Sequence, residues 1–223
     1  MKRILALSIL ALSMILGILT ATVAPAQAAT TDVGVVPASR SCPTSSEAII
    51  IRMDDEDSNN GNDRGGSIGA IRSDSNTEFF FCRVNGASLR AFQPVGSQVK
   101  PYAVLKLGAT CPNGSQEFTR RFDNEDDSNN NSREGNIFPN VSNQNTTLVF
   151  CLFAPGAPTM TAFPNLGFSY LVFSNVDSQG FLRTDDEDDS NNNQYFAAAG
   201  IRSIAQSMVS DGPNTTLRLR AAR

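Results

Sequence analysis

The sequence predicts an all-β protein built from three tandem units. Strands are indicated by seven short segments rich in β-branched and aromatic residues, at 47–53, 78–84, 88–92, 102–107, 147–153, 169–173 and 216–220. A repeated motif predicts the units, because NTEFFFC (76–82), NTTLVFC (145–151) and NTTLRLR (214–220) follow one another at a spacing of 69 residues. Beyond the N-terminal stretch, only 197–208 is compatible with a helical turn, and Gly200 weakens it.

The repeats divide the chain into units of similar length. We predict units at 29–84, 102–153 and 169–223, with linking segments at 85–101 and 154–168. VNGA (84–87) predicts a two-residue hairpin turn between two of the strands. We expect the units to pack as β-sandwich-like modules. A single pseudo-threefold barrel, like a β-trefoil, is the alternative.

The four cysteines follow the repeat. Cys42 and Cys82 are 40 residues apart, and so are Cys111 and Cys151, whereas the third unit has lost both positions together. Joint loss favours partners within one unit over the other possible pairings. We therefore predict the disulfides Cys42–Cys82 and Cys111–Cys151, each clamping the base of a strand pair.

The first 28 residues have the pattern of a secretory signal peptide. Lys2 and Arg3 precede an apolar stretch, and Ala26 and Ala28 form a small-x-small cleavage site. No later segment is apolar enough to span a bilayer. The sequence therefore predicts a secreted, periplasmic or cell-surface protein without membrane insertion after cleavage, and this compartment suits disulfides.

Acidic residues are concentrated in three related motifs, which we call the acidic motifs: 54–60 (DDEDSNN), 123–131 (DNEDDSNNN) and 185–193 (DDEDDSNNN). They hold 13 of the 22 Asp and Glu residues. The acidity is therefore local, set in a chain that is otherwise basic. Arg residues are scattered singly and aromatic residues are few, so we expect no nucleic-acid binding.

The spacing of the carboxylates predicts calcium sites. If the motifs are extended, alternate side chains share one face, and the crowded carboxylates need a counter-charge. Ca²⁺ binds oxygen ligands from Asp, Glu and Asn. The candidate ligands are Asp54, Glu56, Asp57, Asn60, Asp123, Glu125, Asp127, Asn129, Asp185, Glu187, Asp189 and Asn191.

Two other interpretations of the motifs stay open. Arg52, Arg121 and Arg183 each precede a motif and could supply the counter-charge. Alternatively, Asp and Asn side chains could accept backbone N–H groups within a tight turn, which is a structural role.

These observations favour a non-enzymatic, calcium-stabilised extracellular binding or adhesion module, with a carbohydrate or another surface protein as its partner. The chain has no His, which excludes the usual Ser-His and Cys-His nucleophile pairs. A self-assembling structural protein held by Arg–carboxylate contacts is one alternative. A carboxylate-based glycosidase is another, but three equivalent motifs single out no acid/base pair.

Overall fold

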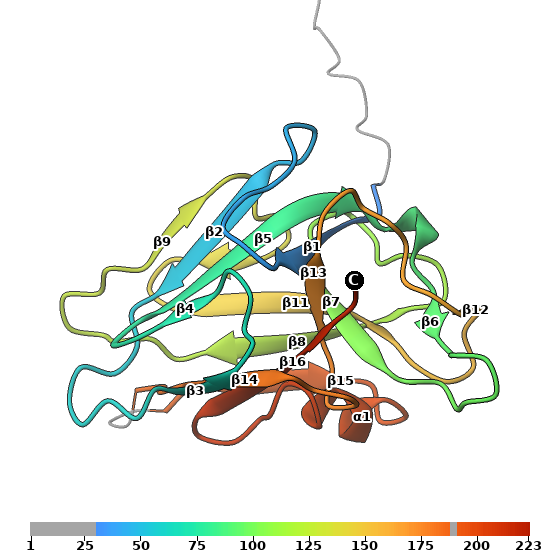
Figure 1. The fold of residues 1–223 in the computed structure, drawn as a ribbon. Coiled ribbons are helices and arrows are strands. Elements are labelled where there is room, and N and C mark those ends of the chain that lie inside the picture. Colours follow the sequence, from blue (N-terminus) through green and yellow to red (C-terminus); the bar gives the residue numbers. More distant parts are fainter. Residues whose placement is uncertain (1–29, 188–190) are drawn as a thin grey trace, which may run out of the picture.

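The computed structural model describes residues 30–187 and 191–223, and these residues form a nearly all-β fold (Figure 1). The predicted all-β class is confirmed. Fourteen strands belong to one sheet, and two short strands form a second sheet. The predicted signal peptide lies outside the described residues. No helix in the described part of the chain is long and apolar enough to cross a membrane.

The large sheet branches into three arms of four antiparallel strands each. In hydrogen-bonding order, arm 1 contains β1 (Asp32–Pro37), β5 (Thr77–Asn85), β2 (Ala48–Met53) and β9 (Ser132–Glu134). Arm 2 contains β7 (Tyr102–Lys106), β11 (Thr146–Phe153), β8 (Gln116–Phe122) and β15 (Gln194–Ala197). Arm 3 contains β13 (Tyr170–Phe173), β16 (Thr215–Ala221), β14 (Gly180–Thr184) and β3 (Asp63–Gly66).

The arms meet at their first strands, because β1, β7 and β13 all pair with one another. The sheet is not closed into a barrel, so the trefoil-like alternative is wrong. The division into three tandem modules stays a prediction. The remaining elements are short: β4 (Arg72–Ser73), β10 (Val141–Ser142), β6 (Ala91–Phe92), β12 (Thr159–Met160), the 3-10 helix η1 (Gly86–Ser88) and the helix α1 (Arg202–Gln206).

The fourth strand of each arm comes from a different part of the chain. The chain leaves β2 of arm 1 and forms β3 in arm 3, then leaves β8 of arm 2 and forms β9 in arm 1. In the same way it leaves β14 of arm 3 and forms β15 in arm 2. The three exchanges complete a cycle, and each crossing segment contains an acidic motif.

One hydrophobic core joins the three arms. Phe81 of arm 1, Phe150 of arm 2 and Phe173 of arm 3 are buried together, with ring centroids of Phe173 at 6.3 Å from Phe81 and 5.4 Å from Phe150. Inward-facing residues alternate with outward-facing ones along the strands, as the pleat requires. A second cluster, which includes Tyr102 and Phe163, fills the space beneath β6 and β12.

The predicted disulfides are confirmed as Cys42–Cys82 and Cys111–Cys151, each with Cα atoms 5.5 Å apart. Cys82 lies opposite Ala48 at the start of the β2–β5 pair, and the acidic motif follows the other end of β2. Cys151 has the matching position in the β8–β11 pair. Each disulfide therefore clamps the end of a strand pair that is remote from the motif.

The predicted hairpin at 84–87 is wrong. Asn85 caps η1, accepting a hydrogen bond from the Ala87 amide, and β6 pairs in parallel with β12 instead of returning along β5. The predicted strand at 88–92 shrinks to the two residues of β6. The expected helical turn in 197–208 is present as α1.

Candidate functional site

The three acidic motifs meet at one end of the molecule. Strands β2, β8 and β14 end at Met53, Phe122 and Thr184, and a motif begins at the next residue in each case. The crossing loops gather at the left of Figure 1, opposite β6 and β12. The first two motifs form turns, with Asn59 and Ser128 in the left-handed region, so the predicted extended face of alternating carboxylates does not form there. The middle of the third motif lies outside the described residues.

The motif backbones form a closed ring of three hydrogen bonds. The amide of Glu125 donates to the Asp54 carbonyl at 3.0 Å. By the same pattern, the amides of Glu187 and Glu56 donate at 3.2 Å to the carbonyls of Asp123 and Asp185. Each motif is thus bonded to the other two.

The first Asp of each motif holds the crossing loop of another motif. Asp123 accepts a hydrogen bond from the Asn192 amide at 2.5 Å, and its own amide donates to Asn193 Oδ1 at 2.8 Å. Asp54 has the same contacts with Asn130 and Asn131, and Asp185 has them with Gly61 and Asn62. These carboxylates are almost fully buried, so the N–H donors replace the water that they lose on folding.

The second position of each motif is fully buried. Its occupants are Asp55, Asn124 and Asp186, and each accepts a hydrogen bond from the crossing Asn, which is Asn62, Asn131 or Asn193. Burial raises the pKa of Asp55 to about 7, against hydrogen bonds from Thr77 and Asn62 that lower it. Burial also raises the pKa of Asp186 to about 8, although the nearby Arg120 lowers it.

The third position carries Glu56, Glu125 and Glu187, all nearly buried. Glu125 accepts backbone hydrogen bonds from Asp127 at 2.9 Å and from Asp57 of another motif at 3.2 Å. Desolvation raises the pKa of Glu187 to about 7, and the surrounding carboxylates raise it further. Glu56, which accepts from the Ser58 amide, and Glu125 therefore brace their turns from within.

The calcium prediction is wrong for the described residues, which contain no group of three or more Asp, Glu, His or Cys residues that could hold a metal ion. The physical reason is that the first-position carboxylates of Asp54, Asp123 and Asp185 accept N–H donors of another motif's loop, whereas Asp57 and Asp127 are exposed. The predicted amide ligands also act as donors: Asn60 and Asn129 bond the carbonyls of Glu56 and Glu125, and Asn191 bonds the carbonyl of Pro213. Asp189 lies outside the described residues.

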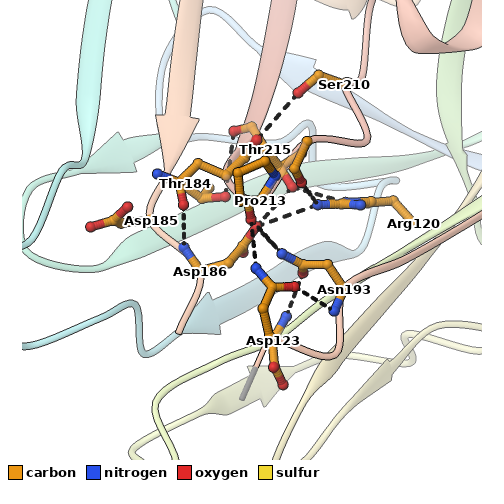
Figure 2. Close-up of polar contacts among 12 residues, drawn as sticks. Arg120, Asp123, Thr184, Asp185, Asp186, Asn193, Ser210, Pro213 and Thr215 are labelled. Carbon is orange, nitrogen blue, oxygen red and sulfur yellow. Dashed lines mark hydrogen bonds and ion pairs between the residues drawn. The ribbon is translucent and has the colours of Figure 1, made fainter. Parts of the chain in front are cut away.

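The cation at the motifs is not one of the predicted arginines. Arg52, Arg121 and Arg183 have no ion pair within 4 Å in the described part of the chain. Arg120 occupies the core-facing side of β8, where only 1% of it is exposed, and lies 3.4 Å from Asp186. Figure 2 shows Arg120 and Asn193 converging on Asp186 beside Thr215.

Two exposed aromatic residues lie beside hollows on the outer surface. Phe196 of β15 is 58% exposed, and a hollow of about 360 Å³ beside it is lined by Glu117, Thr119 and Arg202. Phe138 is 61% exposed and lines two further hollows, of about 300 and 280 Å³. Sequence reasoning missed both aromatic residues, because neither belongs to a motif or to a predicted strand.

The fold and the interlocked motifs define a class of protein: a disulfide-bonded all-β protein whose chain crosses between three arms. The chain belongs to the bacterial ApeC family, whose model, described as Bacterial ApeC, matches residues 19–150. Family membership and the two disulfides indicate an extracellular or surface protein. No curated protein and no solved structure matches the chain.

Proposed function

We propose that the protein is a non-enzymatic extracellular binding module whose binding surface is the outer face of arm 2. This face consists of the outward-pointing residues of β10, β11, β8 and β15. We favour an extracellular carbohydrate as its partner. The acidic motifs are the scaffold of the module, because the first carboxylate of each motif is buried and bonded to the loop of another motif.

The observation that carries the proposal is the exposed ring of Phe196. Its neighbour Tyr195 points inward and stacks on Phe118 at 5.8 Å, so the strand itself directs Phe196 outward. Opposite Phe196 lies Thr119, and Gln194 adds an exposed amide two residues away. An exposed aromatic ring among side chains that form hydrogen bonds suits the apolar faces and hydroxyl groups of a sugar.

The test is affinity gel electrophoresis of the mature chain in gels containing soluble polysaccharides, with Phe196→Ser as the principal variant. We expect at least one polysaccharide to retard the native chain, and Phe196→Ser to abolish the retardation. Its melting temperature should stay unchanged, because an exposed position contributes little to stability.

Two further variants locate the surface. Val95→Ser removes an apolar side chain that is 88% exposed in a loop, and it should bind normally. Phe138→Ser should also bind normally. Loss of binding in Phe138→Ser with full binding in Phe196→Ser would move the site to the hollows at Phe138, and retardation by no polysaccharide would remove the carbohydrate partner.

A further inference from the structure

Arg121 occupies an unusual position on the outer face of arm 2. The register places Arg121 of β8 between Thr147 of β11 and Gln194 of β15. The side chain is partly buried and has neither a hydrogen bond nor an ion pair within the described ranges 30–187 and 191–223. A guanidinium group has five N–H donors in a planar fork, so this one is left with unused donors on the face that we propose for binding.

The two arginines that precede the other motifs are placed differently. Arg52 lies opposite Glu78 of β5, and Arg183 lies opposite Asp63 of β3. Both have an acidic residue as a direct cross-strand neighbour, at a separation where opposite charges attract. Arg121 has only a hydroxyl and an amide in those places, so of the three arginines that precede a motif it alone lacks a direct cross-strand acid.

The acidic residue on the same face of β8, Glu117, does not neutralise Arg121. Glu117 points to the same face, but its carboxylate lies 2.5 Å from Lys106 Nζ. Phe196 is the diagonal neighbour of Arg121, because Gln194 is directly opposite and Phe196 is two residues further along β15. Diagonal neighbours are about 7–8 Å apart, which one sugar ring and its acidic substituent can span.

We propose that this face selects acidic saccharides, with Phe196 stacking on the sugar ring and the Arg121 guanidinium group binding the anionic substituent. The inference rests on the proposed function and names its ligand class. A guanidinium group binds a carboxylate or a sulfate through paired hydrogen bonds. Carboxylated and sulfated saccharides share this chemistry, because both present a pair of anionic oxygens.

The test compares three polysaccharides with the full mature chain: polygalacturonate, which carries carboxylates, dextran sulfate, which carries sulfates, and neutral dextran. The variants are Arg121→Gln, Arg52→Gln and Arg183→Gln, which remove one positive charge each from matched strand positions. Because a hydrogen-bonded charged contact contributes about 1.5–3 kcal/mol, Arg121→Gln should weaken acidic binding by about tenfold or more. The other two variants should bind as the native chain does.

The outcomes separate the two proposals. Acidic binding that depends on both Arg121 and Phe196, weakens with salt and exceeds binding to dextran supports the inference, and the preferred polymer distinguishes carboxylate from sulfate. Binding that depends on Phe196 but is unchanged in Arg121→Gln overturns the inference and leaves the proposed function standing. An equal loss in all three Arg variants also overturns it, because only the overall charge would matter. Binding to no polysaccharide overturns both.

Discussion

At the second position of the motifs, the same buried place is occupied by Asp55, by Asn124 or by Asp186. Asp55 and Asp186 have raised pKa values because burial penalises the charged carboxylate more than its hydrogen bonds favour it. Asn124 fills the equivalent place with a neutral amide and keeps the bond from Asn131. The chain itself therefore shows that an amide fits this position.

The first prediction concerns the stability of the protein as a function of pH. A buried carboxyl whose pKa is raised from 3.8 to about 7, as for Asp55, holds its proton in the folded state over that range while the unfolded chain releases it. The free energy of unfolding therefore falls as the pH rises from about 4 to about 8, by up to about 1.4 kcal/mol per pH unit for one proton. Thermal melts across this range measure the decline.

Asp55→Asn should flatten this decline, because the amide does not titrate and resembles Asn124. Asn124→Asp should steepen it by placing a carboxyl at the second position of all three motifs. Asp177→Asn is the control, because Asp177 is half exposed on its side chain and has a lowered pKa, mainly through its hydrogen bond from Lys100. Identical pH profiles for the native chain and Asp55→Asn would contradict the prediction.

The second prediction concerns Arg120, the buried cation at the motifs. Arg120→Met leaves Asp186 without its ion pair, while the bonds from Thr215 and Asn193 remain. Breaking one side of a buried pair costs about 3–5 kcal/mol. We expect that loss in denaturant unfolding at pH 9, and a smaller loss at pH 6, which lies below the raised pKa of Asp186 of about 8. The double variant Arg120→Met/Asp186→Asn should recover part of the lost free energy of unfolding. A loss of the same size at both pH values would contradict the explanation.

Among the elements, the crossing loops tie the arms together through single asparagine side chains. Asn193 accepts from the Asp123 amide and donates to Asp186, so one side chain links two motifs. Asn131 and Asn62 link the other pairs of motifs in the same way. Each loop also ends in a short strand that completes another arm.

The third prediction compares two adjacent residues of one loop. Asn193→Ala should lower the free energy of unfolding by about 2–3 kcal/mol, because it leaves buried donors and acceptors without partners. Asn192→Ala is the matched control, because Asn192 bonds Asp123 through its backbone amide and its side chain has no hydrogen bond with any described residue. Equal losses in the two variants, measured by urea unfolding, would contradict this role.

Sequence reasoning found the strands in which apolar and polar residues alternate, because that pattern lies within a few consecutive residues. It found the disulfides because the third unit lacks both cysteine positions together. It could not find β3, β9 and β15 as exchanged strands. Ser132–Glu134 is polar throughout and owes its structure to pairing with Ile50, Ile51 and Arg52 of β2, a strand from a distant part of the chain. The motifs were recognised but given the wrong counter-charge, because Arg120 and Arg121 differ only in which face of β8 they occupy.

For the whole molecule, the shared core and the exchanged strands make each arm depend on the other two. Arm 2 receives β15 from the C-terminal part of the chain, and arm 1 receives β9 from the middle. The core aromatic residues of the three arms contact one another. Cooperative unfolding is therefore expected to involve all described strands together.

The last prediction tests this dependence. The chain without its predicted signal peptide, residues 29–223, should unfold in a single transition, with a calorimetric enthalpy equal to the van 't Hoff enthalpy. A fragment of residues 102–153 should stay unfolded even with Cys111–Cys151 formed. It lacks β15, its strand β9 has lost β2, and the first and third positions of its motif have lost their partners on the other motifs. The disulfide contributes only about 4 kcal/mol, which is less than the core and the loop contacts that the fragment lacks. Two or three separate transitions, or a fragment that gives a cooperative melt, would show that the units are stable modules in their own right.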